Sequence, residues 1–447
     1  MTQPDLIVRA ARALVDGRWE AASLAVREGR IAEIGPLDAP WTAAQDVRLP
    51  DDEVLLPGVV DSHVHVNEPG RTEWEGFATA TTAAAAGGVT TILDMPLNSI
   101  PPTTTPEALA VKKAAAAPKA RVDVGFWGGA VPENLGSLRA LHEAGVFGFK
   151  CFLSPSGVEE FGHLDRAQLR AAQQELAAFD GLLIVHAEDP AVLEAHANTG
   201  GTHYADFVAS RPDGAETSAI AAVIEGLRAT GGRAHILHLS SAKALPLIAS
   251  AKAEGLRLTV ETCPHYLTFD AEHIPDGATE YKCCPPIRDE RNREALWDAL
   301  LAGTIDLVAS DHSPATRELK LGADGDFGRA WGGISGLAVS LSAVWTGARA
   351  RGIGLESVSA WLSAAPARLA GLADKGVIRQ GAAADLVAFA PERSYTVRAE
   401  QLPYRNKVSA FDGAALHGQV VRTWLAGETI HPASAGQPPR GRLLDRP

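Results

Sequence analysis

Residues 54–65 read VLLPGVVDSHVH, an apolar run that ends in two histidines, and residues 66–70 add the stretch VNEPG. A strand buried on both faces accounts for the apolar residues but not for the histidines. Side chains two positions apart on a strand point to the same face, so His63 and His65 can bind one metal ion. A lone histidine on an apolar strand is more often an ordinary core residue, but this spaced pair favours a ligand role.

Seven further apolar runs follow along the chain, and helix-like segments such as AQLRAAQQELAAF and REALWDALLAG lie between them. The runs are TTILDMP, VDVGFWGGA, FGFKCFL, LLIVHAED, AHILHLSS, LRLTVETCPHY and IDLVASDHSP. Buried strands that alternate with helices are typical of a parallel sheet in the α/β class. Eight such units predict a (β/α)8 TIM barrel.

The two ends of the chain read differently from the middle. Residues 5–48 and 385–431 carry short strand-like runs separated by turn residues, such as Asp16-Gly17 and Glu28-Gly29. We therefore expect a small β-sandwich built from both termini, with residues 1–54 and 375–447 on either side of a barrel over residues 55–374. The tail SAGQPPRGRLLDRP is expected to be flexible.

Composition narrows the choice of partner. The 447 residues are 46% hydrophobic and 21% charged, with a net charge of -13 and no cluster of Lys and Arg. Such a chain is a poor match for nucleic acid or an anionic membrane, so a small-molecule substrate is expected. No apolar stretch approaches the ~20 residues of a membrane span and no signal peptide is evident, which predicts a cytoplasmic protein. The four cysteines form no C-x-x-C pair and are expected to be reduced.

Four more polar residues fall on the predicted strands, and barrel enzymes gather such groups at the C-terminal mouth. His186 and His238 end the fifth and sixth strands and can hold a second ion. Two cations repel each other unless an anion lies between them, and the fourth strand offers Lys150 there. A desolvated lysine with a lowered pKa can react with CO2, and its carbamate can bridge two metal ions. Asp311 completes the set as a ligand or proton carrier.

Each of these residues also has a simpler interpretation. Lys150 by itself is a strand-end lysine whose amine reaches water, and Asp311 in ASDHSP can cap a turn. Three other histidines compete for the ligand roles. We expect His235 near the N-terminal end of its strand, His265 in an outer shell of the site, and His312 facing away from Asp311.

The motifs together resemble the cyclic amidohydrolases of the amidohydrolase superfamily, over nearly the whole chain. The matching stretches are PGVVDSHVH, FKCFL, VHAED, HLSS, ETCPHYL, KCCPPIR and SDHSP. The resemblance implies two divalent metal ions, expected to be zinc, and a homo-oligomer, expected to be a tetramer. It also implies a set of metal ligands, which are His63, His65, Lys150 carbamylated by CO2 (N6-carboxylysine), His186, His238 and Asp311, and it makes Asp311 the catalytic proton carrier.

The residues around these ligands indicate the branch of the superfamily. Dihydroorotases of this type typically carry an arginine, which binds a carboxylate, where this chain has Asn67. An asparagine suits a neutral ureide, and HVHVNEPGRTEWEGF with GGVTTILDMPLNSIPPTTT resembles the allantoinases, which open the ring of allantoin to allantoate in purine breakdown. Asn67, Ser313 and the backbone of CCPPIR are candidate substrate contacts, although Asn67 can equally shape the turn before Pro69-Gly70.

Other functions remain open at this point. Hydantoinase or dihydropyrimidinase activity is the main alternative, and Arg71 close to Asn67 keeps dihydroorotase possible as an anion-binding rival. Some members of the fold have lost metal ligands and act as binding proteins. The complete set of ligand positions argues against that class here.

Overall fold

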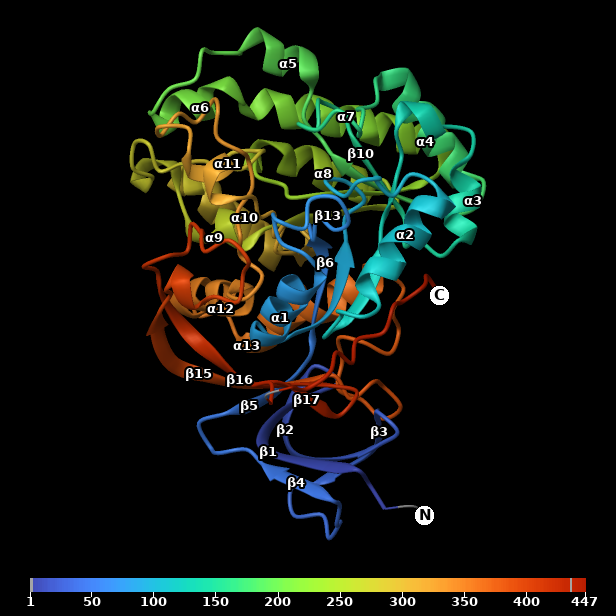
Figure 1. The fold of residues 1–447 in the computed structure, drawn as a ribbon, viewed down its shortest axis with the longest axis vertical. Coiled ribbons are helices and arrows are strands. Elements are labelled where there is room, and N and C mark those ends of the chain that lie inside the picture. The colour runs from blue at the N-terminus through green and yellow to red at the C-terminus, as the bar shows by residue number, and fades with distance from the viewer. Residues whose placement is uncertain (1–2, 435) are drawn as a thin grey trace.

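Eight parallel strand positions form a closed barrel in the computed structural model, which describes residues 3–434 and 436–447 (Figure 1). They are β6 (Val59–Val64), β7 (Val89–Asp94), β8 (Asp123–Phe126) continued by β9 (Gly128–Gly129), β10 (Phe149–Phe152), β11 (Leu182–His186), β12 (Arg233–Ile236), β13 (Leu258–Thr262) and β14 (Leu307–Val308). A parallel bridge from Val64 to His312 closes the ring between β6 and the residues after β14. The predicted barrel is confirmed.

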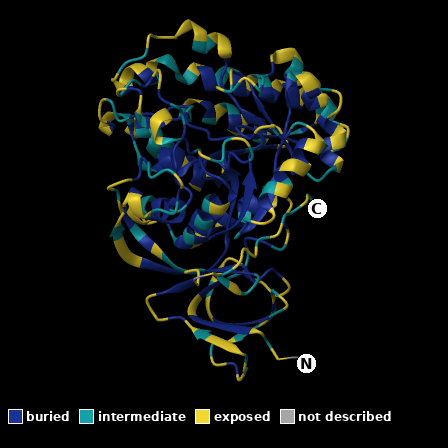
Figure 2. Cartoon of the chain, viewed as in Figure 1, coloured by how far each residue is buried: buried dark blue, intermediate teal, exposed yellow. Residues whose placement is uncertain are grey.

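Helices cover the outside of the barrel, so their outer faces are exposed while the strands are buried (Figure 2). The main ones are α1 (Phe77–Ala86), α2 (Pro106–Ala116), α3 (Leu138–Glu143), α4 (Arg166–Ala177), α7 (Asp213–Thr230), α8 (Leu245–Ala253), α10 (Glu290–Leu301) and α12 (Ser340–Ala350). Shorter helices are α5 (Pro190–Ala195), α6 (Tyr204–Ser210), α9 (Pro264–Thr268), α11 (Arg317–Leu321), α13 (Leu355–Ser359) and α14 (Ala365–Leu369). None of the helices in the described ranges is long and apolar enough to span a bilayer.

Both ends of the chain contribute to a second sheet, which lies below the barrel in Figure 1. Its path is β17-β16-β15-β5-β1-β2-β3, with β4 paired to β1. The strands are β1 (Leu6–Val15), β2 (Arg18–Arg27), β3 (Arg30–Pro36), β4 (Gln45–Arg48), β5 (Val54–Pro57), β15 (Leu386–Thr396), β16 (Ala415–Leu425) and β17 (Glu428–His431). This agrees with the predicted β-domain formed from both termini.

The apolar run over residues 54–64 contributes one strand to the terminal sheet and one to the barrel. Val54–Pro57 pairs with β1 and β15 of the terminal sheet, whereas Val59–Val64 pairs with β7 of the barrel. Gly58 lies between them, and a Cβ there would stand 2.2 Å from Thr90 Oγ1, so only glycine fits. The chain therefore passes from the terminal sheet to the barrel at Gly58, inside an apolar run that is buried on both sides of it.

The C-terminal tail differs from its prediction as a flexible segment. Its described residues 436–447 run beside β8, where the Gly441 amide donates to the Ala120 carbonyl and the Leu444 amide donates to the Val124 carbonyl, at 2.9 and 2.8 Å. Leu443 and Leu444 pack partly buried against the core. The prediction rested on the polar, proline-containing composition of the tail, whereas its two leucines pack on an apolar surface of the barrel.

A buried lysine joins the barrel to the terminal sheet. Lys375, which is 4% exposed, places its Nζ 2.9 Å from Asp123 Oδ2 on β8 and 2.5 Å from Asp385 Oδ2 beside β15. Asp385 also accepts a hydrogen bond from the Ala426 amide at 2.8 Å. Arg442 Nη2 also lies 3.2 Å from Asp123 Oδ2, so Asp123 has two cationic partners, whereas Lys375 is the one cation paired with Asp385 among the described residues.

Replacing this ammonium group should destabilise the protein strongly. Lys375→Met leaves Asp385 buried without a counter-charge and Asp123 with Arg442 alone, which should lower the free energy of unfolding by about 3–5 kcal/mol. Urea denaturation followed by circular dichroism measures the loss. The control is Lys243→Met, because Lys243 is exposed and forms no ion pair within the described residues. Equal stability of the two variants would contradict a joining role for Lys375.

Candidate active site

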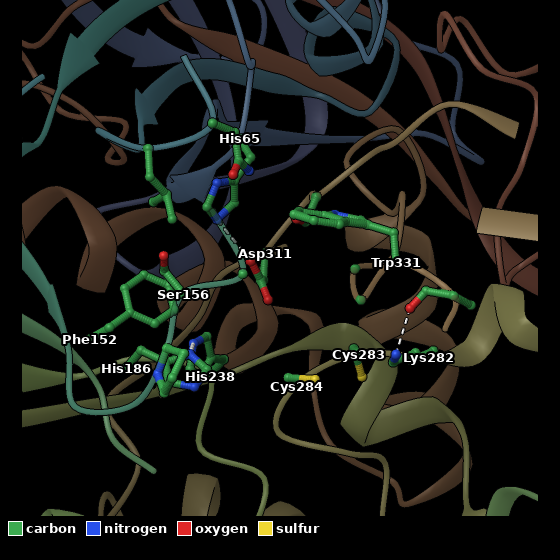
Figure 3. Close-up of a pocket in the computed structure, with 18 of the residues that line it drawn as sticks. His65, Phe152, Ser156, His186, His238, Lys282, Cys283, Cys284, Asp311 and Trp331 are labelled. Carbon is green, nitrogen blue, oxygen red and sulfur yellow. Dashed lines mark hydrogen bonds and ion pairs between the residues drawn. The ribbon is translucent and has the colours of Figure 1, made fainter. Parts of the chain in front are cut away.

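A cavity of about 280 Å³ opens at the carboxyl ends of the barrel strands (Figure 3). Of the predicted site residues, those that line it are His65, Lys150, His186, His238, Asp311 and Ser313. His63 is fully buried and lies against Lys150 and Asp311. The structure thus brings the six predicted ligand positions together from β6, β10, β11 and the loops after β12 and β14.

The first group of potential metal ligands is His63, His65 and Asp311, whose ligand atoms lie within 4.8 Å of one another. Asp311 Oδ1 is 3.0 Å from His63 Nε2 and 3.6 Å from His65 Nε2. Lys150 Nζ lies 3.5 Å from the same His63 nitrogen. Burial lowers the pKa of Lys150 to about 8, so its amine is unusually easy to deprotonate.

His186 and His238 form the second group. His186 Nδ1 and His238 Nε2 face each other at 3.0 Å, and burial lowers the pKa of both rings. Neutral imidazole is the form that binds metal. Two nitrogens bound to one tetrahedral zinc ion are about 3.3 Å apart, given Zn–N bonds of about 2.0–2.1 Å. The observed separation suits a shared ion.

Two buried glutamates, which the sequence analysis did not single out, orient these rings. Glu261 Oε1 lies 2.5 Å from His63 Nδ1, which leaves His63 Nε2 free to face Asp311. Glu188 Oε2 lies 2.7 Å from His186 Nε2, which leaves His186 Nδ1 free to face His238. The carboxylates thus select opposite tautomers in the two histidines. A glutamate inside the apolar run LTVET was the available signal for Glu261.

Each glutamate has further partners that keep it ionised. Arg211 donates to Glu188 from Nε at 3.0 Å and from Nη2 at 2.5 Å. Burial opposes ionisation, yet Arg211 and His186 hold the pKa of Glu188 well below its usual range. His63 and His235 likewise lower the pKa of Glu261 to about 2 against the effect of burial. The barrel interior therefore contains fixed negative charge beside both groups of ligands.

Asp311 and His238 have unusual backbone conformations. Their φ angles are 43° and 35°, in the left-handed region that residues other than glycine rarely adopt. Such conformations cluster at functional sites, where the surrounding fold holds them in place. Although burial opposes it, His63 holds the pKa of Asp311 well below its usual range. Asp311 is therefore an anion that can accept a proton or bind a cation.

The three competing histidines take separate places. His235 Nε2 lies 3.0 Å from Glu261 Oε2, on the carboxylate oxygen that does not contact His63. His265 is buried beside Cys263 and Asp311, and the potential ligand atoms of these three residues lie within 4.8 Å of one another. His312 faces Glu75, at 3.6 Å, and the ring of Tyr404. As expected, His312 does not join Asp311 at the cavity.

Asn67 lies outside the group of described residues that line the cavity. It is 1% exposed, and its Nδ2 donates to the Pro314 carbonyl at 3.2 Å. Its φ of 66° fits the alternative role of shaping the turn before Pro69-Gly70. Arg71, the possible anion binder, contacts Glu160 and the Asn98 carbonyl instead. The cavity wall contains Asn98, Arg211, Lys282 and Trp331, which the sequence analysis did not select as site residues.

Comparisons with known proteins agree with this geometry. The amidohydrolase family profile matches residues 54–430. The chain is 55% identical to an allantoinase from Streptomyces avermitilis over all of both chains. It is 46% identical to an allantoinase from Saccharomyces cerevisiae, over 87% of this chain and 86% of the relative, and 44% identical to one from Arabidopsis thaliana, over 92% and 85%.

The fold of this protein also resembles a solved structure along nearly the whole chain. The L-hydantoinase from Arthrobacter aurescens superposes with a TM-score of 0.92 at 31% identity, over 99% of this chain and all of the other. Its barrel and terminal sheet therefore share one architecture with this protein. On sequence and fold alike, the chain belongs to the amidohydrolase family, within the group that its allantoinase relatives represent.

Proposed function

We propose that this protein is an allantoinase, which hydrolyses a ring amide of allantoin and releases allantoate. The observation that carries the proposal is 55% identity to the Streptomyces avermitilis allantoinase over the full length of both chains. The cavity supports it, because three buried histidines with a lowered pKa, His65, His186 and His238, lie with an ionised aspartate, a group that suits metal-assisted amide hydrolysis. Each of the six predicted ligand positions holds a side chain that can bind a metal ion, so a catalytic role fits better than a binding role.

The proposal includes two divalent metal ions, taken to be zinc. The residues that would hold them are His63, His65, carbamylated Lys150, His186, His238 and Asp311. His65, His186 and His238, whose pKa is lowered by burial, an ionised Asp311 and two carboxylate-oriented rings form a donor set that fits such ions. Although burial opposes it, Asp311 and Glu261 raise the pKa of His63 to about 9, so this ring would release a proton on binding a metal ion. When bound, the ions polarise the target carbonyl and lower the pKa of a water molecule at the site.

Lys150 is proposed to carry the carbamate that lies between the two groups of ligands. Burial lowers the pKa of Lys150 to about 8, which raises the share of neutral amine near neutral pH above that of an ordinary lysine. The neutral amine attacks CO2, loses one proton and becomes a carbamate anion. The Lys150 side chain is 1% exposed, so this anion is protected from bulk water.

Asp311 is proposed to move the proton. Its carboxylate takes a proton from the attacking water and delivers it to the ring nitrogen as the C–N bond breaks. The water oxygen stays on the carbonyl carbon as a carboxylic acid, which releases the second water proton to solvent, and the ring nitrogen leaves as an N–H of the opened chain. Ser313 and the backbone of CCPPIR are proposed to hold the ring amides, and of these residues Ser313, Cys283 and Cys284 line the cavity.

Hydantoin hydrolysis is the second candidate, because the fold superposes closely on a hydantoinase. Dihydroorotase activity receives less support, since Arg71 is occupied by Glu160 and the Asn98 carbonyl. We also propose a cytoplasmic homotetramer, a proposal that rests on resemblance to relatives alone.

Substrate preference tests the proposed function directly. The zinc-loaded protein should hydrolyse allantoin with a kcat/KM at least tenfold above its values for hydantoin, dihydrouracil and dihydroorotate. Ring opening of each compound can be followed under identical conditions. A preference for hydantoin or dihydrouracil would replace the proposal with the second candidate.

Loss of Lys150 should remove both bridged metal and turnover. We expect Lys150→Ala to retain its fold, to bind less zinc, and to lose more than about 1,000-fold in kcat. A small carboxylic acid such as propionate should restore part of the activity by replacing the carbamate. Zinc content by atomic absorption and kcat with added acid are the measurements. Wild-type activity and zinc content in Lys150→Ala would exclude the carbamate.

Glu261 should control metal affinity through His63. Glu261→Gln keeps the shape of the side chain but removes its charge, so zinc affinity should fall about 10- to 100-fold. Competition with a chelator measures this affinity, and thermal denaturation reports any loss of folding. Glu225→Gln serves as the control, because Glu225 pairs with Arg170 on the protein surface. Unchanged zinc affinity in Glu261→Gln would contradict the orienting role.

A further inference from the structure

Lys282 brings a positive charge to the wall of the active-site cavity that no carboxylate of the described chain neutralises. It lies in the connection from β13 to β14, it is 8% exposed, and it lines the cavity beside Cys284 (Figure 3). Its Nζ donates to the Ala330 carbonyl at 2.5 Å and to the Gly328 carbonyl at 3.4 Å. An ammonium group has three N–H donors, so one of them is available to a ligand.

Other buried lysines show how this protein usually compensates such a charge. Lys112 Nζ lies 2.8 Å from Asp94 Oδ2, and Lys375 pairs with two carboxylates. A buried cation without an anionic partner destabilises the fold, because backbone carbonyls replace only part of its hydration. Burial accordingly lowers the pKa of Lys282. An anionic ligand in the cavity would supply the partner that the fold does not.

The charged lining of the cavity is mostly cationic, although the chain has a net charge of -13. Asp311 is the only carboxylate among the described residues of the lining, and the cations are Lys150, Arg211, Lys282 and Arg329. Lys150 belongs to the proposed metal site, Arg211 is paired with Glu188, and Arg329 is exposed. Lys282 is therefore the buried cation of the lining whose charge can meet a ligand.

A second cavity, of about 240 Å³, shares this part of the wall. Arg211, Lys282 and Cys284 line both cavities. The rest of its lining comes from residues 193–210 after β11 and residues 327–328 after β14. Lys282 Nζ lies 5.5 Å from the centre of the Phe207 ring, which belongs to this second lining. Lys282 thus stands at the boundary between the metal site and a further space at the barrel mouth.

The proposed reaction produces the anion that such a position can bind. The amide bond that breaks is neutral, whereas its hydrolysis leaves a carboxylate on the former carbonyl carbon. We propose that Lys282 binds the carboxylate of the ring-opened product when the product leaves the metal site toward the second cavity. This inference rests on the proposed function, because it requires that the enzyme opens a cyclic amide.

The test compares the product allantoate with its primary amide, which differs only in replacing the carboxylate by a neutral group. Both are measured as inhibitors of allantoin hydrolysis by the zinc-loaded protein. Wild type should bind allantoate at least about tenfold more tightly than the amide, and Lys282→Met should lower this preference about tenfold. Metal ions act on the carboxylate in both proteins, so the change in preference reports the lysine.

Lys320 provides the matched control. It is 4% exposed, and its Nζ donates to the Lys282 carbonyl at 2.7 Å and to the Trp331 carbonyl at 3.0 Å, so it also anchors the loop over residues 328–331. Lys320 does not line the cavity within the described chain. Lys320→Met should therefore lower the melting temperature but keep the preference for allantoate over its amide within about twofold of wild type.

A second variant separates the charge of Lys282 from its hydrogen bonds. Lys282→Gln keeps an N–H donor for the Ala330 carbonyl but has no charge, so it should lose the preference as Lys282→Met does. It also replaces Lys282→Met if that variant does not fold. Zinc content and thermal denaturation are compared for all variants.

The outcomes distinguish the inference from the function on which it rests. A selective loss of allantoate binding in the Lys282 variants supports the inference. It is overturned if wild type shows no preference for allantoate over its amide, if the Lys282 variants keep that preference, or if Lys320→Met loses it equally. If wild type opens hydantoin instead of allantoin, the proposed function fails, and N-carbamoylglycine and its amide then test Lys282 in the same way.

Discussion

The active site depends on a carboxylate buried inside the barrel, that of Glu261. A charge in this position is tolerated only where partners neutralise it, and Glu261 lies 2.5 Å from His63 Nδ1 and 3.0 Å from His235 Nε2. Its Oε1 also accepts a hydrogen bond from the His238 amide at 3.2 Å. One side chain on β13 therefore joins β6 and β12 and sets the orientation of a ligand histidine. The contact between Glu261 and His63 therefore both neutralises a buried charge and fixes the orientation of the His63 ring.

In the second group of ligands a buried glutamate again orients a histidine ring, but it contacts the other ring nitrogen. Glu188 contacts Nε2 of His186, whereas Glu261 contacts Nδ1 of His63, so the two rings expose opposite nitrogens. Arg211 neutralises Glu188 and also lines the cavity. Farther from the mouth, Lys375 supplies the counter-charge for two carboxylates where the barrel meets the terminal sheet. In each case a buried charge is placed by a partner from another element.

Much of the fold was predictable because local pattern and tertiary structure agree. Apolar runs alternate with helical segments, and both faces of each barrel strand are buried, so the count of units led to the barrel. The pairing of His63 with His65 followed from strand geometry alone. The change of sheet at Gly58 and the packing of Leu443 and Leu444 were not predictable, because each depends on a surface formed by distant residues.

The sequence by itself determined the architecture, the family and the convergence of polar strand ends on one mouth, since these follow from periodicity and motif spacing. Only the tertiary structure decided which nitrogen of each histidine is free and which asparagine faces the cavity. Asn67 and Asn98 follow adjacent strands with similar backbone angles, and no local pattern separates them. Nδ2 of Asn67 donates to the Pro314 carbonyl, which the fold brings in from beyond β14, whereas Asn98 lines the cavity.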